Sequence, residues 1–205
     1  SSHKNFISKF HFLLRPNYLL NSKLKKLIVI NKRGAHFRYE SSYPQDHKVW
    51  QPVLGPGDFY GDAPEMVTNS YDNAILFNVD GFFRNLFPDI ESFGSLTRDT
   101  IFIYTSDHGQ SLYENGALSL HCGKTSPEAR VPLIILGNLG KPVDINYQSS
   151  HTNIFPTLLD LMGIDQSLWA HNYDASLLSA GSGYVPARHY FNGQTNEILI
   201  YSDLP

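Results

Sequence analysis

The sequence predicts an α/β protein of three layers, with helices on both faces of a largely parallel central sheet and a small antiparallel hairpin near the C-terminus. Three observations predict this fold. Short apolar runs typical of buried strands recur along the chain, amphipathic stretches of helical length lie between them, and an Asn-Gly pair near the end separates two strand-like segments. Strands that alternate with helices are typical of parallel sheets, whose ligands bind at the carboxyl ends of the strands.

Length and composition indicate one globular domain. The 205 residues are enough to bury a sizeable core, and we expect a single domain over residues 1–205. Hydrophobic residues make up 41% and charged residues 17%, and the net charge of -3 gives no reason to expect a nucleic-acid partner. No apolar run approaches the roughly 20 residues that cross a bilayer. The single cysteine, Cys122, excludes an internal disulfide.

The first half of the chain is predicted to hold a strand, a long loop and a helix. The apolar run Leu27–Ile30 is typical of a strand that is covered on both faces. Four prolines and three glycines within residues 41–64 indicate a long loop, and long loops inside compact domains are often functional. In residues 70–87 apolar side chains recur every three or four positions, which predicts an amphipathic helix capped by Asn69 or Ser70.

The second half is predicted to hold two further strands, a helix and the hairpin. Residues 100–105 and 131–137 are apolar runs of strand length. Residues 150–163 have the period of a helix, and Gly163 supplies its end. Residues 188–203 are predicted to form two antiparallel strands around the Asn-Gly pair.

The strand at residues 100–105 leads directly into Ser106-Asp107-His108-Gly109. Carboxylate oxygen and imidazole nitrogen are both zinc ligands, so Asp107 and His108 are a candidate zinc site at the carboxyl end of a strand. Gly109 permits a tight turn that aims both side chains the same way. An ordinary polar strand end has the same residue types, and the residues by themselves leave both interpretations open.

Two other histidines follow predicted strands. His36 comes after Leu27–Ile30, and His121 comes thirteen residues after His108. Cys122 lies beside His121, and its sulfur is also of a zinc-ligand type. A hydrogen-bonded structural histidine remains the alternative at both positions.

Five segments in one order resemble the alkaline phosphatase superfamily, specifically its sulfatase and phosphoethanolamine transferase branch. They are GAHFRYESSYP (34–44), NSYDNAILFNVDGFFRNL (69–86), TIFIYTSDHGQSLYENG (100–116) with the LH that follows, EARVPLIIL (128–136) and SHTNIFPTLLDLMGI (150–164). The resemblance covers residues 27–164. It implies that the chain is the C-terminal part of a sulfatase-like catalytic domain.

The resemblance implies a metalloenzyme that transfers phosphoryl or sulfuryl groups of phosphate or sulfate esters. Asp107 and His108 match the paired ligands of the catalytic zinc. His36 and His121 match two catalytic histidines that bind the transferred group or hold a second zinc. Such a metal offsets the charge that develops on the oxygens of the transferred group.

The resemblance also favours one branch and one location. GAHFRYESSYP and SLYENG look more like the transferase branch, which favours phosphoethanolamine transfer onto a lipid or glycan over hydrolysis of sulfate esters. That branch works outside the cytoplasm, on the periplasmic side of the inner membrane.

The N-terminal part departs from the family pattern. In the family a metal-binding carboxylate and the nucleophile lie well upstream of the segment that His36 matches, but the 35 residues before His36 contain no Asp or Glu. The nucleophile is therefore unknown, and we expect an N-terminal segment of the same enzyme to be missing. The alternative is a complete but degenerate protein. With two of four zinc ligands, the isolated chain is expected to bind zinc weakly and to be incomplete as an enzyme.

Two other functional classes stay open at this point. In a non-catalytic module with a degenerate sulfatase fold, the aromatic-rich loop of residues 41–64 would hold a glycan or a lipid headgroup. An α/β domain with a histidine-rich surface would need no site. An upstream segment with a carboxylate and a Thr, Ser or Cys between strand and helix would favour the enzyme.

Overall fold

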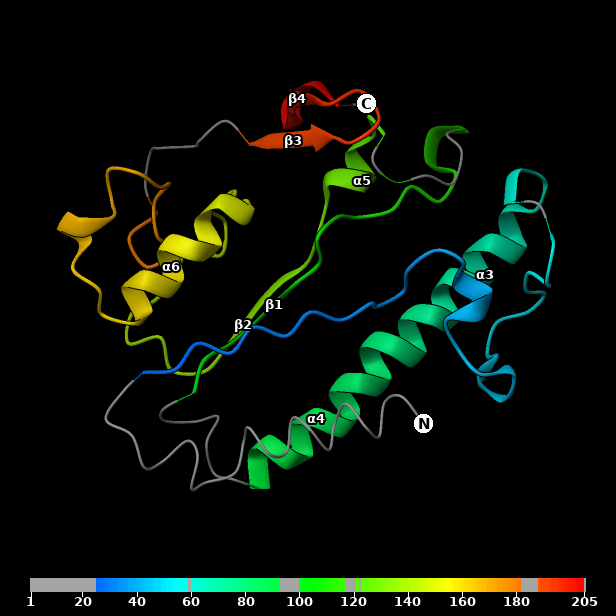
Figure 1. Ribbon diagram of the computed structural model, residues 1–205, viewed down its shortest axis with the longest axis horizontal. Coiled ribbons are helices and arrows are strands. Elements are labelled where there is room, and N and C mark those ends of the chain that lie inside the picture. Colours follow the sequence, from blue (N-terminus) through cyan, green and yellow to red (C-terminus); the bar gives the residue numbers. More distant parts are fainter. Residues whose placement is uncertain are drawn as a thin grey trace. The chain divides into compact units, whose positions relative to one another are not determined.

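The structure is a computed structural model that describes residues 25–58, 60–92, 100–116, 121, 123–181 and 188–204. Its chain divides into two compact units, which we describe separately. The first unit comprises Ser1–Thr97 and Ser111–Leu120, and the second comprises Arg98–Gln110 and His121–Pro205. Helices and strands are both present, as the predicted α/β class requires (Figure 1). The expectation that residues 1–205 form a single domain stays a prediction.

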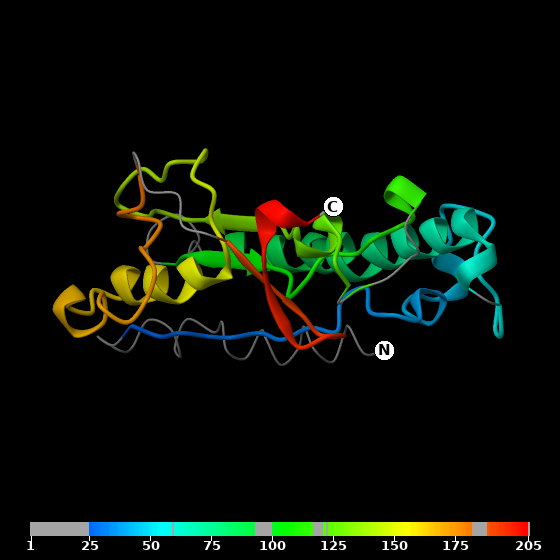
Figure 2. The ribbon, with the colours of Figure 1, turned by 90° about the horizontal axis from the view of Figure 1, so that it is seen from above.

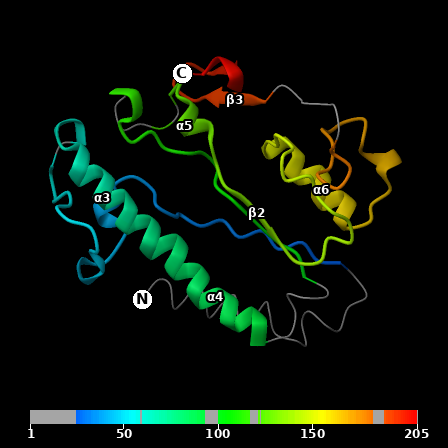
Figure 3. The same ribbon diagram turned by 180° about the vertical axis from the view of Figure 1, so that it is seen from behind.

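The first unit is built on one long helical stretch, seen from both sides in Figures 1 and 3. It consists of α3 (Pro64–Ile75), a π-helical segment (Leu76–Asp80) and α4 (Gly81–Ser92). The helix therefore begins at Pro64, and the prediction that Asn69 or Ser70 caps it is wrong. Proline suits the first turn because its ring presets the helical φ and its missing N–H would have no helical partner there. Glu65 adds a negative charge in the first turn, where it interacts favourably with the positive end of the helix dipole.

Polar side chains of α3 bind the backbone of the preceding loop instead of capping the helix. Asn73 Oδ1 accepts hydrogen bonds from Val49 N at 2.8 Å and Trp50 N at 3.1 Å, and Asn73 Nδ2 donates to Trp50 O at 2.9 Å. Ser70 Oγ accepts from Leu54 N at 3.0 Å. Asn73 and Ser70 are fully buried. The long loop predicted for residues 41–64 is confirmed, and α3 holds its backbone in place.

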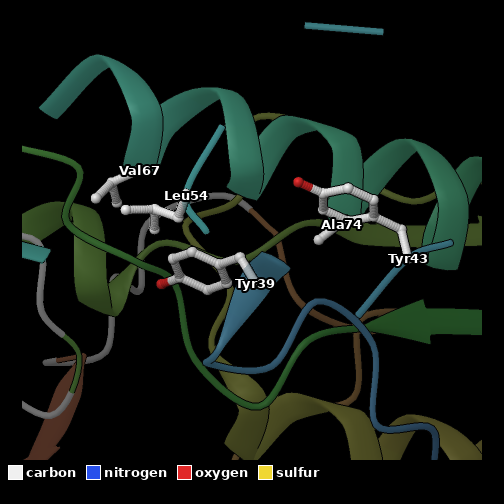
Figure 4. Packing of buried hydrophobic residues seen from close by; sticks show 5 residues of the cluster. All are labelled: Tyr39, Tyr43, Leu54, Val67 and Ala74. Atoms are coloured by element: carbon white, nitrogen blue, oxygen red, sulfur yellow. The ribbon is translucent and has the colours of Figure 1, made fainter. Parts of the chain in front are cut away.

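The hydrophobic core of the first unit lies between α3 and this loop. Its buried members are Tyr39, Tyr43, Leu54, Val67 and Ala74. Figure 4 shows Val67 and Ala74 of α3 pointing toward the other three side chains. The family-like segment of residues 34–44, which contains His36, therefore also supplies the core residues Tyr39 and Tyr43.

Residues Leu27–Ile30 form no strand in the structure, so this prediction is wrong. No strand is assigned to this segment, and it pairs with no strand among the described residues. Val29 is 81% exposed and Leu27 is 48% exposed. An apolar run becomes a buried strand only where neighbouring strands and helices cover it. The described residues do not cover this one.

Lys32 contacts the π-helical segment of the first unit. Its Nζ donates to Asn78 O at 2.7 Å and lies 3.6 Å from the centre of the Phe82 ring. Burial lowers the pKa of Lys32 from its usual 10.5 to about 8. The charged form is disfavoured because burial removes the water that would otherwise solvate it.

This pKa predicts how stability depends on pH. Between pH 8 and 10.5 the unfolded chain keeps the Lys32 proton and the folded chain has lost it, so the free energy of unfolding rises with pH across this window. We expect a gain on the order of 1 kcal/mol for this partly exposed group. Urea titrations across the window should show the gain in the unaltered chain and in a control Lys26→Met variant, but not in Lys32→Met. Parallel pH curves for all three proteins would contradict the prediction.

The second unit holds two small sheets and two helices. Its elements are β1 (Phe102–Thr105), α5 (Ser126–Ala129), β2 (Leu133–Leu136), α6 (Ile154–Leu161), β3 (His189–Asn192) and β4 (Glu197–Ile200). β3 and β4 form an antiparallel hairpin (Figure 2), as predicted. Helix α6 is also confirmed. Ser150 and Asn153 form a capping box at the start of the 3₁₀ turn His151–Asn153 that leads directly into α6, and Gly163 follows the end of α6 with φ 68°.

β1 and β2 are antiparallel, whereas a largely parallel sheet was predicted. Phe102 lies opposite Leu136, and Thr105 lies opposite Leu133. Two parallel strands need a crossover connection of a dozen or more residues between them, and this connection usually contains an α-helix. The connection between β1 and β2 contains only the four-residue α5 and a short 3₁₀ turn among its described residues. No parallel sheet occurs in the described part of the chain, and the three-layer arrangement stays a prediction.

None of the helices in the described ranges combines the length and the apolar character that a membrane crossing requires.

Candidate metal site at the end of β1

Asp107 and His108 lie just past the end of β1. Asp107 Oδ1 accepts hydrogen bonds from His108 N at 3.0 Å and from Ser106 Oγ at 3.3 Å. The side chain of Asp107 is 87% exposed, and that of His108 is 36% exposed. The strand thus presents both groups at the surface of the second unit.

The Asp107 carboxyl is ionised at neutral pH. Burial is the largest single influence and raises its pKa, but the neighbouring His108 and the hydrogen bonds from backbone N–H groups and Ser106 together outweigh it. The pKa of Asp107 therefore lies below its usual 3.8. Metal binding requires the carboxylate form, which is the form present here.

His108 presents one nitrogen for a metal. Its Nδ1 lies 2.7 Å from Gly109 O. Because a carbonyl only accepts, Nδ1 carries the proton, and Nε2 of the neutral ring keeps a free lone pair. A carbonyl that holds Nδ1 in this way is the usual support of a metal-binding histidine.

The two donor atoms are spaced nearly as one zinc ion would need them. His108 Nε2 lies 3.9 Å from Asp107 Oδ2. Two atoms that bind one tetrahedral zinc at about 2.0–2.2 Å are about 3.4 Å apart. The pair therefore fits zinc in ligand type, and its two donor atoms are about 0.5 Å farther apart than one tetrahedral zinc requires. Among the residues that the structure describes, no three His, Cys, Asp or Glu side chains form a metal-binding group.

His121 stacks on His108. The ring centres are 5.1 Å apart, and the ring planes differ by 11°. The fold thus brings together three of the four predicted site residues, all in the second unit. Cys122, the neighbour of His121, lies outside the described residues.

His36, the fourth predicted site residue, belongs to the first unit. It is exposed, and Ser42 Oγ donates to its backbone carbonyl at 3.0 Å. Its Nδ1 contacts the carbonyl of Phe37. Its predicted role as a catalytic residue stays a prediction.

Gly109 fits its position because it has no side chain. A Cβ there would lie 2.1 Å from Pro127 O and 2.4 Å from Arg130 O. Its N donates to Glu128 O at 2.7 Å. At Gly109 the chain thus passes close to the backbone of α5 and of Arg130, which follows α5.

Two residues beside the site were missed in the sequence. Glu128 is fully buried, and its carboxylate accepts hydrogen bonds from Gly123 N and Thr125 Oγ1. His151 Nε2 lies 3.2 Å from Thr105 Oγ1 at the end of β1. The sequence shows only that Glu128 is a glutamate shortly before an apolar strand. No local pattern indicates that such a glutamate is buried.

Comparison with known proteins decides the family. The family model named Sulfatase matches residues 6–164 of this chain. The chain belongs to the sulfatase family. The matched residues include all five segments that resemble the family, the last of which also ends at residue 164. The resemblance is therefore confirmed.

Curated relatives of this sulfatase-family chain are phosphoethanolamine transferases. It is 25% identical over 185 residues to Kdo(2)-lipid A phosphoethanolamine 7''-transferase of Salmonella typhimurium, a match that covers 78% of this chain and 32% of that protein. It is 29% identical over 182 residues to phosphoethanolamine transferase EptA of the same organism, with 78% and 31% covered. The chain spans about a third of the length of these relatives.

A solved structure shares the fold. The C-terminal periplasmic domain of EcEptC from Escherichia coli, crystallised in complex with Zn, matches with a TM-score of 0.71 at 22% identity. The match covers 99% of this chain and 57% of that chain. The sulfatase-family chain therefore has an α/β fold similar to that of the EcEptC domain.

Proposed function

We propose that this chain is part of the catalytic domain of a zinc-dependent phosphoethanolamine transferase with a lipid or glycan acceptor. The observation that carries the proposal is the Asp107-His108 pair at the end of β1, with His121 stacked on His108. The names of the curated relatives support the reaction, and the zinc complex of the EcEptC domain supports the metal.

In this proposal the residues have separate roles. Asp107 supplies a carboxylate oxygen and His108 supplies Nε2 to the zinc, and His121 binds the transferred phosphoryl group. The same role for His36, which lies in the first unit, stays a prediction. Zinc, when bound, offsets the negative charge that develops on the phosphoryl oxygens. The low pKa of Asp107 keeps its carboxylate available at neutral pH. The nucleophile and the remaining metal ligands would come from other residues of the enzyme, which we place outside the cytoplasm, as the EcEptC domain is periplasmic.

Zinc affinity tests the metal site. Substitutions in the outer shell of a zinc site commonly weaken binding about 10- to 100-fold, so loss of both proposed ligands should weaken it by at least about 100-fold. We expect this from an Asp107→Ala/His108→Ala variant, measured by direct titration of each protein with zinc in a calorimeter, which suits the weak binding expected of this chain.

A matched control removes an aspartate and a histidine that the proposal does not use. Asp174 and His171 are exposed in the same unit. An Asp174→Ala/His171→Ala variant should bind zinc as the unaltered chain does. Equal zinc affinity of the unaltered chain and the Asp107→Ala/His108→Ala variant would contradict the proposed ligands.

A further inference from the structure

We infer that Glu128 is a positioning residue that holds the segment after His121 against the turn after His108. This inference rests on the proposed metal site and extends it to a residue that touches neither the metal nor the substrate. Glu128 lies in α5 and is 0% exposed. Its hydrogen-bond partners Gly109, Gly123 and Thr125 all belong to the second unit.

The carboxylate of Glu128 binds the segment after His121 with both oxygens. Oε2 accepts from Gly123 N, and Oε1 accepts from Thr125 Oγ1 at 2.6 Å. A Cβ on Gly123 would lie 2.9 Å from each carboxylate oxygen, so glycine allows the backbone to approach this closely. The position of Gly123 in turn restricts His121, which lies two residues earlier.

The backbone of Glu128 binds the segment after His108. Its carbonyl accepts from Gly109 N at 2.7 Å, and Gly109 directly follows His108. One residue therefore contacts both segments that carry the stacked rings, one through its side chain and the other through its backbone. The rings of His108 and His121 are held 5.1 Å apart between these anchors.

The energetics favour a positioning role. The Gly123 N–H that Glu128 binds is buried, and a buried donor that loses its partner costs free energy, so this geometry is costly to distort. An apolar residue in place of Glu128 would leave the N–H of Gly123 and the hydroxyl of Thr125 without this partner. A role in placing the His121 segment accounts for a carboxylate at this buried position.

The stacked rings provide a readout that needs no zinc. Ring currents displace the Hε1 resonance of each stacked imidazole, which ¹³C-labelled histidine makes visible by NMR. We expect Glu128→Ala to move the resonances of His108 and His121 toward the positions of unstacked rings and to leave His171 unchanged.

Conservative variants separate positioning from charge. In Glu128→Gln the amide oxygen can accept from Gly123 N, and the amide nitrogen can donate to the Thr125 hydroxyl, which both donates and accepts. Glu128→Gln should therefore restore most of the stacking. Thr125→Val, which loses one hydrogen bond, should fall between Glu128→Ala and the unaltered chain, and Thr125→Ser should behave as the unaltered chain. These two variants carry the test if Glu128→Ala does not fold.

A stability-matched control removes a different buried polar group of the same unit. Thr157 Oγ1 donates to Asn153 O at 2.6 Å and accepts from Leu177 N at 2.9 Å. Thr157→Val should lose stability without moving the resonances of His108 and His121. The inference is overturned if a folded Glu128→Ala protein keeps its stacking, or if Thr157→Val disturbs the stacking equally. If Glu128→Ala loses the stacking while Asp107→Ala/His108→Ala keeps its zinc affinity, the positioning role stands and the proposed zinc ligands do not.

Discussion

Replacing Gly109 with alanine is expected to destabilise the second unit by about 3 kcal/mol, at the upper end of typical overpacking costs. The added Cβ would lie 2.1 Å from Pro127 O and 2.4 Å from Arg130 O. Both atoms belong to the backbone, which cannot move aside as the end of a flexible side chain can. The turn after His108 must therefore separate from α5, and we expect the stacking on His121 and the zinc affinity to fall together with the stability.

Gly181→Ala is the matched control for this prediction. Gly181 lies in the same unit, and a Cβ there would meet nothing within 4 Å. Its free energy of unfolding should change by no more than about 0.5 kcal/mol. Urea unfolding followed by circular dichroism, with a zinc titration of each protein, makes the comparison. A Gly109→Ala protein as stable as Gly181→Ala would show that the contact with α5 is not as close as the structure has it.

Replacing Asn73 with alanine is expected to destabilise the first unit by about 3 kcal/mol. The side chain makes three hydrogen bonds to the backbone of Val49 and Trp50. Without it, two N–H groups and one carbonyl lose their partners, and a buried residue is replaced by a cavity. The loop should then detach from α3 before the whole unit unfolds.

Limited proteolysis measures this detachment directly. Lys48 lies in the loop next to Val49, so trypsin cleavage after Lys48 should become faster in Asn73→Ala. The control is Asn85→Ala, because Asn85 is exposed on α4 and its side chain binds only the carbonyl of Gly81 in the same helix among the hydrogen bonds described. Asn85→Ala should leave both the cleavage rate and the unfolding free energy nearly unchanged. Equal cleavage rates in the two variants would refute the role of Asn73.

Local signals were sufficient for several elements. The helical period of residues 150–163 and Gly163 predicted α6 and its end, and the Asn-Gly pair predicted where the turn between β3 and β4 begins. Each of these features depends on contacts between close neighbours, such as the capping box of Ser150 and Asn153. A sequence pattern records such contacts directly.

Elements that depend on distant partners were predicted less well. Leu27–Ile30 has the composition of a buried strand, but burial requires other segments to cover it. The helix prediction started too late because Asn69 and Ser70 have the residue types of caps, whereas Ser70 actually binds Leu54 N of the loop. The direction of β2 depended on the path of the chain after β1, which apolar runs do not encode.

The sequence by itself determined the residue types at the site and its place in the fold. An apolar strand followed by Asp107-His108 puts a carboxylate and an imidazole at a strand end, and the order of the motifs identified the sulfatase family. Only the tertiary structure decided that His121 stacks on His108, that Gly109 must be glycine and that Glu128 joins the two segments. Those facts are contacts between residues 13 to 21 positions apart or between a side chain and the backbone, and such contacts exist only once the chain has folded.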